Sequence, residues 1–445
     1  MAYLQRVPSS AGNRKTFTMS AWIKPTAGNR TMFSAWSADN VAGHFVWRTK
    51  SDGTIGWSRW SEDSYSTRKL RDENAWYHCV IAVDTTQATA SNRIKLYVNN
   101  EQITSFSVGA NYPAQNTDLP VNNATSQTIG LNNYSSSGNA YAGYMSHFHL
   151  VDGLQLTPST FGSTDSTTGE WQINTSPTIS DYGTCGFFMF KDDNSANDDS
   201  GKGNNFNLNG TLPKSEDCPS NVFATGNPLI GIHSNGSVLV PHTYSNGNLT
   251  STSSGQQWRI HQSTLGASSG KYYAEFKLIS NSGTWYSYVG IYDLDGYAQK
   301  VSGYPYLSDM ANTYGLKDSN GQIHTGGSGT SYGVSYGTGN IIGVAMDLDN
   351  NKLYFSKDGT WMNSANPSNG TGGYSITADK TYAFGIQQYA QNSIVWSANY
   401  GNGYIGTTEI TTNTGTGYQD ADGNGRFYYA VPTGFRCLST KGLNQ

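Results

Sequence analysis

The chain has 445 residues, about three times the roughly 150 residues of an average domain, so two or three domains are expected. Charged residues make up only 13%, while the chain holds 51 Gly, 30 Tyr and 11 Trp, which argues against disorder and against long solvated helices. The 27 basic and 31 acidic residues are scattered and leave a net charge of -4, without the basic stripe that a nucleic-acid partner needs. The composition therefore favours an all-β protein that binds no nucleic acid.

Membrane insertion and export are not expected from the sequence. No apolar run approaches the roughly 18 residues that cross a bilayer, and the opening MAYLQRVPSS lacks the apolar core of a signal peptide. Cys79, Cys185, Cys218 and Cys437 lie far apart, without the short spacings that are typical of zinc ligands. We therefore expect reduced thiols, as in proteins that are assembled in the cytosol.

The first half of the chain alternates apolar and polar residues with a period of two, which predicts antiparallel strands with one wet face. The clearest predicted strands are 16–24, 76–83, 93–98 and 144–151. Between HFVWRTK and TIGWSRW stand Ser51, Asp52 and Gly53, which predict a tight hairpin because Asp and Gly tolerate a positive φ.

A second β-rich block begins near Gly226. Its predicted strands are KYYAEFKLI, YSYVGIY, NIIGVAMDL, KLYFSKDG and YAFGIQQY, and 347–352 (DLDNNK) join two of them as a hairpin. The residues between about 296 and 340 are rich in Gly, Ser and Tyr, which favours long surface loops of the kind that often carry binding sites. The predicted organisation is a sandwich over 1–212, a linker over 213–227, a sandwich over 228–425 and a C-terminal tail over 426–445.

The first block resembles the laminin-G-like, concanavalin A-like jelly-roll fold. The motifs that carry this resemblance are FTMSAWIK at 17–24, WYH at 76–78 followed by Asp84, LYVNN at 96–100, Ile129-Gly130, and the stretch from Tyr144 into LVDGLQLTPSTFG. The segment Phe187–Gly210 is similar to the opening strands of such domains, although here it follows the other strands. We therefore expect it to return and complete the first sandwich.

The second block resembles the SPRY (B30.2-like) sandwich. Its matching motifs are GKYYAEFKL at 270–278, VGI at 289–291, YGL at 314–316, GNIIGVAMD at 339–347, LYFSKDG at 353–359, YAFGI at 382–386 and the stretch 396–401. The loops depart from the family pattern, so the resemblance implies no particular ligand. The predicted fold class is all-β, with two tandem antiparallel β-sandwich domains, concanavalin A-like and then SPRY-like.

The tandem is similar to large structural proteins of tailed bacteriophages, particularly marine ones. This resemblance includes the junction NVFATGNPL and the ending DGNGRFYYAVPTGFRCLSTKGLNQ. It implies a non-enzymatic virion surface protein, part of a tail fibre, spike or capsid appendage, that is assembled in the host cytoplasm. The implied partners are a host cell-surface glycan or receptor, other virion proteins and further copies of the same chain.

Two other functions stay open at this point. A polysaccharide-degrading enzyme could use the same scaffold, but glutamates are scarce and none stands in the alternating E-x-D-x-x-E arrangement that aims two carboxylates at one bond. A structural connector or decoration protein without glycan affinity is the other alternative.

Metal binding has two weak candidates. The acidic loop residues Asp192, Asp193, Asp198 and Asp199 supply the oxygen ligands that calcium prefers, although Asp and Asn also favour turns for backbone reasons alone. His147 and His149 alternate on one predicted strand and should share a face, but no third ligand is evident. Apart from possible calcium, no cofactor is expected.

Aromatic residues outside the regular strand pattern give the strongest binding signal. An exposed ring on a rigid loop offers an apolar platform to a sugar ring, and the same geometry suits a protein hot spot. The candidate ligand-binding residues in or beside the loops of the second block are Trp285, Tyr286, Tyr297, Tyr304, Tyr306 and Trp361.

Overall fold

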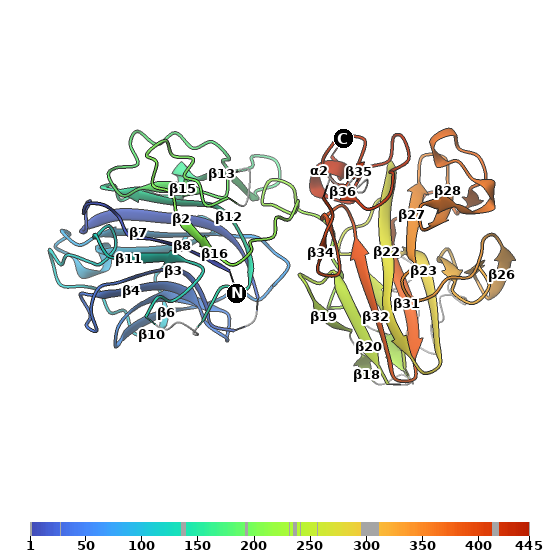
Figure 1. The fold of residues 1–445 in the computed structure, drawn as a ribbon, viewed down its shortest axis with the longest axis horizontal. Helices are drawn as coiled ribbons and strands as arrows, with labels where there is room; N and C mark the ends of the chain where they lie inside the picture. The colour runs from blue at the N-terminus through green and yellow to red at the C-terminus, as the bar shows by residue number, and fades with distance from the viewer. Residues whose placement is uncertain are drawn as a thin grey trace. The chain divides into compact units, whose positions relative to one another are not determined.

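A computed structural model describes residues 2–26, 28–134, 139–191, 195–230, 232–234, 238–240, 242–255, 257–294, 311–411 and 418–444 (Figure 1). Strands form nearly all of the regular structure there, and the short helix α2 (Thr440–Leu443) lies near the C-terminus. By its contacts the chain divides into two units, 1–214 and 215–445. Within the described parts, no helix has both the length and the apolar character needed to span a membrane.

The first unit is a sandwich of two antiparallel sheets. One sheet has the spatial order β10 (Phe106–Val108), β6 (Glu62–Lys69), β5 (Thr54–Arg59), β4 (His44–Thr49), β3 (Arg30–Trp36), β11 (Ser126–Ile129), β1 (Tyr3–Arg6) and β16 (Asn207–Asn209). The other has the order β15 (Phe187–Met189), β12 (Gly143–Asp152), β2 (Thr16–Pro25), β7 (Tyr77–Asp84), β8 (Ile94–Val98) and β9 (Glu101–Ile103). The core lies between them, where the rings of Phe33 and Trp47 contact Phe148 at centroid distances of 6.3 and 6.0 Å.

The late segment 187–210 completes this sandwich, which confirms the prediction of its return. Strand β15 pairs with β12, and β16 pairs with β1. The guanidinium of Arg6 on β1 lies 5.0 Å from the ring centroids of Phe187 and Phe206 and donates to the carbonyl of Cys185. The predicted hairpin at 51–53 is also confirmed, since β4 pairs with β5 across it.

The second unit is built from two larger sheets. The first, which we name the β22 sheet, has the order β19 (Thr243–Ser245), β20 (Thr250–Ser254), β32 (Ser393–Asn399), β22 (Lys271–Ser282), β27 (Ile341–Asp347), β28 (Lys352–Lys357) and β29 (Thr360–Trp361), with β30 (Tyr374–Ser375) also paired to β28. The second, the β23 sheet, has the order β21 (Gln257–Gln262), β31 (Tyr382–Ala390), β23 (Trp285–Asp293), β24 (Tyr314–Lys317), β25 (Gln322–Thr325) and β26 (Ser328–Ser331). The hairpin predicted at 347–352 joins β27 to β28, with Asn351 at a φ of 55°.

Short antiparallel strand pairs lie outside the large sheets of both units. They are β13 (Gly162–Thr164) with β14 (Trp171–Ile173), β17 (Ile232–Ser234) with β18 (Val238–Val240), β33 (Tyr404–Ile405) with β34 (Thr408–Glu409), and β35 (Tyr418–Gln419) with β36 (Arg426–Phe427). All four cysteines are free thiols, as the sequence predicts.

The C-terminal segment forms a further layer on the β22 sheet. Phe427 and Phe435 are fully buried against Tyr273, whose ring centroid lies 5.1 Å from that of Phe427. Phe223, in the stretch expected as a linker, is buried in the same layer and bridges to Ser439. The residues expected as linker and tail therefore pack on each other and on the sandwich.

His78 in the first unit is a fully buried, neutral imidazole. Its ring stacks between Trp22 and Trp171 at centroid distances of 5.0 and 5.9 Å. The Trp171 Nε1–H donates to its Nδ1 at 2.9 Å, so Nε2 carries the proton and donates to Ser20 Oγ at 2.8 Å. Burial lowers the pKa of His78 to about 3.

This burial predicts acid sensitivity of the first unit. Below about pH 6.5 the unfolded chain binds a proton at His78 and the folded chain does not. The free energy of unfolding is therefore unaffected by His78 above that pH, and it falls by about 1.4 kcal/mol for each pH unit below it. We expect His78→Phe to reduce the slope of unfolding free energy against pH by one proton between pH 6 and 4, as measured by urea titration. An unchanged slope would contradict the buried neutral state.

Candidate functional site: an aromatic patch on the second unit

The sequence-predicted aromatic residues do not form one loop cluster. Trp285 and Tyr286 are the first two residues of strand β23, so their side chains point to opposite faces of the sheet. Trp285 packs against the core between the sheets, whereas Tyr286 points outward and is 41% exposed. Tyr297, Tyr304 and Tyr306 lie outside the described residues.

Trp361 lies on β29, in the other sheet of the unit. It is half-buried beside the C-terminal layer, and its ring centroid lies 6.2 Å from that of Tyr273. The structure therefore assigns Trp285 and Trp361 to packing and leaves Tyr286 as the described candidate that faces solvent.

Tyr286 belongs to a row of aromatic side chains that crosses three neighbouring strands. In the register of the β23 sheet, Tyr389 on β31 stands opposite both Trp258 on β21 and Tyr286 on β23. Because cross-strand partners share a face, the three rings meet on the outside of the sheet. Their centroids are 5.5 Å apart for Trp258 and Tyr389, 6.0 Å for Tyr286 and Tyr389, and 6.2 Å for Trp258 and Tyr286. We name these three residues the aromatic patch.

A second set of side chains packs next to this patch. Tyr288 is 8% exposed, and its ring centroid lies 6.1 Å from that of Trp258 and 5.3 Å from that of His324 on β25. Ile260, fully buried, packs in the same cluster. Partial burial and the nearby Lys317 ammonium lower the pKa of His324, which favours the neutral imidazole near pH 7. The patch is therefore a rigid, uncharged surface on strands.

Such a surface is suited to binding by contact. Tyr and Trp rings bury a large area at little cost in side-chain entropy, and each keeps a polar group that can donate a hydrogen bond. Rings that are only half covered by the protein can stack on a sugar ring or fill the centre of a protein interface. The sequence signal for the missed residues Trp258, Tyr288 and Tyr389 is their alternation within strands, but that alternation is also what core packing produces.

In the acidic loop that was considered for calcium, the described carboxylate of Asp198 already accepts hydrogen bonds from the protein. Asp198 Oδ1 accepts from the backbone N–H groups of Phe188 and Ser200, and Oδ2 accepts from the Asn204 N–H and the Ser200 hydroxyl. The Asp199 N–H donates to the carbonyl of Phe188, while Asp192 and Asp193 lie outside the described residues. Asp198 therefore connects the turn at residues 198–204 to strand β15 through hydrogen bonds.

The two histidines of β12 do not form a metal site. The strand is irregular between Ser146 and His149, and His147 has a φ of 48°, so simple alternation fails at this point. Both imidazoles contact the ring of Phe188, and His149 Nδ1 is hydrogen-bonded to the Tyr182 hydroxyl at 2.9 Å. Among the described residues, no group of three or more His, Cys, Asp and Glu side chains could hold a metal ion.

Comparison with protein families agrees with this architecture. Residues 2–160 match the model of the concanavalin A-like lectin/glucanases superfamily, and residues 272–372 match that of the SPRY domain. No curated protein matches the chain.

Similar solved structures include the SPRY domain of human HERC1, with 18% identity, coverage of 35% of this chain and 91% of that chain, and a TM-score of 0.27. A heptameric SAP-like pentraxin from Limulus polyphemus has 18% identity, with coverage of 35% and 72% and a TM-score of 0.26. The TRIM65 PSpry domain has 10% identity, with coverage of 40% and 88% and a TM-score of 0.27. By its sheets and its two family matches, the chain is an all-β protein in which a concanavalin A-like domain is followed by a SPRY domain.

Proposed function

We propose that this chain is a non-enzymatic surface protein of a tailed-phage virion, part of a tail fibre, spike or capsid appendage, that binds a host-surface glycan or receptor. The domain pair supports a binding role, because both matched families are compact sandwiches of the lectin-like kind. The virion assignment rests on the similarity of the tandem, its junction and its ending to phage structural proteins, and with it we propose contacts to other virion proteins and to copies of the chain.

The aromatic patch is the observation that carries the proposed binding. Tyr286 is 41% exposed on the outer face of the β23 sheet, near the end of its strand, and its neighbours Trp258 and Tyr389 are only half-buried. A contiguous apolar surface of this kind has a cost in water that a bound ligand would remove. We therefore assign the host contact to this face of the second unit.

The test is binding of the full chain to arrays of bacterial capsular polysaccharides and lipopolysaccharides and to host cells. We expect Trp258→Ala, Tyr286→Ala and Tyr389→Ala each to weaken binding by about thirtyfold, the effect of removing a hot-spot aromatic. Tyr286→Ala decides the test, because its exposed ring can be removed with little change in melting temperature. Tyr418→Ala, which removes a ring that is 44% exposed elsewhere in the unit, should bind like wild type.

Stable patch variants with unchanged binding would remove this face from the proposal. A blank array together with no adsorption of the wild-type chain would favour a structural connector. Shortening of a polysaccharide on incubation with the pure chain would favour a degrading enzyme instead.

A further inference from the structure

The first unit carries its own group of aromatic rings at the surface, far along the chain from the aromatic patch. Ala35 on β3 belongs to the core, so Trp36, the next residue, points to the outer face of that sheet. Trp60 and Tyr134 meet it there, with ring centroids 4.9 Å apart for Trp60 and Tyr134 and 6.3 Å apart for Trp36 and Tyr134. We name Trp36, Trp60 and Tyr134 the Tyr134 cluster.

The rings of this cluster remain partly open to solvent. Tyr134 is 48% exposed, and Trp36 and Trp60 are half-buried. The buried ring of His44 lies against two of them, with its centroid 5.9 Å from that of Tyr134 and 6.0 Å from that of Trp60. The planes of Trp60 and Tyr134 meet at 86°, so the two rings form a corner and not a flat platform.

The loop that carries Tyr134 is fixed to two strands of the sheet. The side-chain amide of Asn133 donates to the carbonyl of Ser126 on β11 at 2.8 Å. The Asn133 N–H donates to the hydroxyl of the buried Ser34 on β3 at 3.0 Å. The position of the neighbouring Tyr134 is therefore set by the sheet before any ligand arrives.

Trp60 occupies an unusual backbone position. It is the first residue of the two-residue turn between β5 and β6, and its φ is 55°. Gly is the usual residue at a positive φ in such a turn, because a bulky side chain is strained there. The Trp60 N–H donates to His44 Nδ1 at 2.9 Å, which helps to hold this conformation. Strained positions of this kind are found at ligand clamps, which points to a task for the Trp60 ring.

The charges around the cluster leave one carboxylate without a cation. Both nearby arginines are ion-paired, in the pairs Arg59–Glu62 and Arg48–Asp63. Asp39 is exposed, and its Oδ1 accepts from the Trp36 Nε1–H at 3.1 Å, but it forms no ion pair with any residue that the structure describes. Burial lowers the pKa of His44, so this imidazole adds no positive charge near pH 7.

Ring faces beside an unpaired carboxylate favour a cationic ligand, because the face of an aromatic ring carries partial negative charge. A primary ammonium would need acceptors for three N–H donors, and Asp39 is the carboxylate that the cluster offers. A quaternary ammonium has no N–H donor, and its methyl groups can lie on the rings.

We propose that the Tyr134 cluster binds a quaternary ammonium group, which contacts the rings of Trp60 and Tyr134 and has the Asp39 carboxylate as its counter-charge. The site lies in the other unit from the aromatic patch, and it does not rest on the proposed function.

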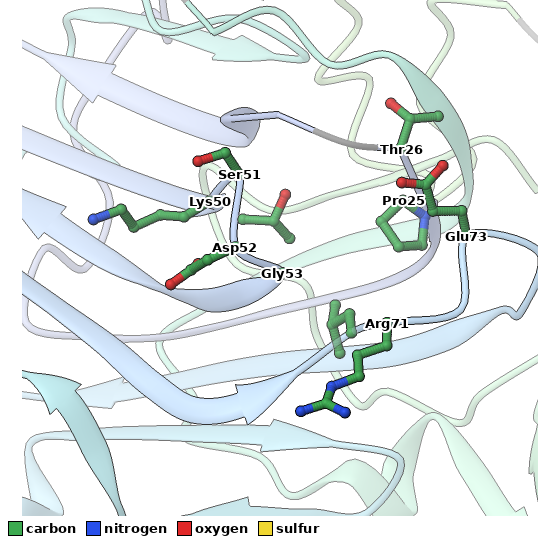
Figure 2. A pocket seen from close by; sticks show the side chains of 10 residues that line it. Pro25, Thr26, Lys50, Ser51, Asp52, Gly53, Arg71 and Glu73 are labelled. Carbon is green, nitrogen blue, oxygen red and sulfur yellow. The ribbon is translucent and has the colours of Figure 1, made fainter.

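A hollow elsewhere in the first unit supplies a matched control. It has a volume of about 190 Å³ and lies at the other end of strand β4, where Figure 2 shows Asp52 and Glu73 with Lys50 and Arg71 around it. None of the ten residues that line it is aromatic, and its four charges sum to zero. The exposed carboxylate of Glu73 therefore stands beside a hollow without rings.

The test is saturation-transfer NMR on the full chain with choline, with its neutral isostere 3,3-dimethylbutan-1-ol, and with glycerophosphocholine, the soluble headgroup of a choline lipid. We expect choline to bind with a Kd of about 1 mM and the isostere to bind at least about fivefold more weakly. The phosphate of glycerophosphocholine should weaken its binding, because it approaches Asp39.

Two variants test the rings and the charge separately. Tyr134→Ala removes the most exposed ring, and Asp39→Asn removes the charge but keeps an acceptor for Trp36 Nε1–H. Each should weaken choline binding at least about threefold, with little change in melting temperature. Glu73→Gln at the hollow and Tyr286→Ala at the aromatic patch should bind choline like wild type.

Three results would overturn the proposal. The first is no binding of choline, and the second is equal binding of the neutral isostere, which would indicate an apolar site. The third is choline binding that Tyr286→Ala removes and Tyr134→Ala retains, which would place the cation on the aromatic patch. Tighter binding of glycerophosphocholine than of choline, lost in Tyr134→Ala, would support the site and identify a lipid headgroup as the source of the ammonium group.

Discussion

A chain that ends at Gly425 is expected to lose the cooperative unfolding transition of the second unit and to keep that of the first. The missing residues include Phe427 and Phe435, both fully buried, and removal of one buried Phe typically costs about 3–5 kcal/mol. Their loss would also uncover Tyr273 and Tyr354 on the β22 sheet. The summed loss in free energy of unfolding is as large as the whole stability of a typical domain.

Glu275 makes the same segment indispensable for a second reason. This carboxyl is fully buried on β22, where Oε2 accepts from the Tyr428 N–H and Oε1 from the Tyr429 N–H, both at 2.8 Å. Asn399 also donates to it at 3.1 Å, and burial raises the pKa of Glu275 to about 7. The Tyr273 hydroxyl is a fourth donor, at 3.3 Å, so without the C-terminal segment this acid would keep two of its four donors.

Two point variants separate this effect from loss of chain length. Glu275→Ala leaves the N–H groups of Tyr428 and Tyr429 without acceptors, so we expect a loss of about 3–5 kcal/mol in the second transition. Glu409→Ala, at an exposed glutamate of the same unit, should change it by less than about 0.5 kcal/mol. Calorimetry of the full chain measures both. Equal stability of the two variants would show that the hydrogen bonds from Tyr428 and Tyr429 to Glu275 do not hold the C-terminal segment in place.

The elements that depend on neighbouring residues could be predicted from the sequence. The hairpin at 51–53 and the turn at 347–352 follow from local backbone preferences and the alternation on each side, and both are present. The return of β15 and β16 could be predicted because the segment 187–210 is similar to opening strands of a known fold.

Features that depend on distant pairing could not be predicted in this way. The patch exists because the strand order places Trp258 and Tyr286 on either side of Tyr389, a fact that no local pattern contains. Tyr286 was proposed as a candidate because it was expected in or beside a loop, whereas the structure places it in strand β23. The role of Glu275 could not be predicted either, because the Tyr428 and Tyr429 N–H groups that donate to it lie more than 150 residues later in the chain.

Asp152→Ala is expected to destabilise the first unit by about 3–5 kcal/mol, because this carboxylate joins three segments that are distant in sequence. It is 6% exposed; Oδ1 accepts from the Asn13 N–H at 2.7 Å and the Asn122 amide at 3.1 Å, and Oδ2 accepts from the Cys185 N–H at 2.9 Å. Removal of the side chain takes this acceptor from the buried Asn122 amide and Cys185 N–H and withdraws a negative charge from near Arg6. The segment after Cys185 then loses the hydrogen bond that fixes its start, while Arg6 still donates to the Cys185 carbonyl and the pairings of β15 and β16 remain.

The measurement is urea unfolding of the full chain, with the two transitions followed separately. Asp118→Ala is the matched control, because its carboxylate is 54% exposed and its 3.9 Å contact with Lys15 is an exposed ion pair that contributes at most about 1 kcal/mol. Asp152→Asn should fall between the two, since an amide can accept at one oxygen but presents a donor to the other partner. A loss below about 1 kcal/mol for Asp152→Ala would show that water replaces the carboxylate. It would also mean that the return of residues 187–210 is held by the burial of Phe187 and Phe206 beside Arg6 rather than by this hydrogen-bond junction.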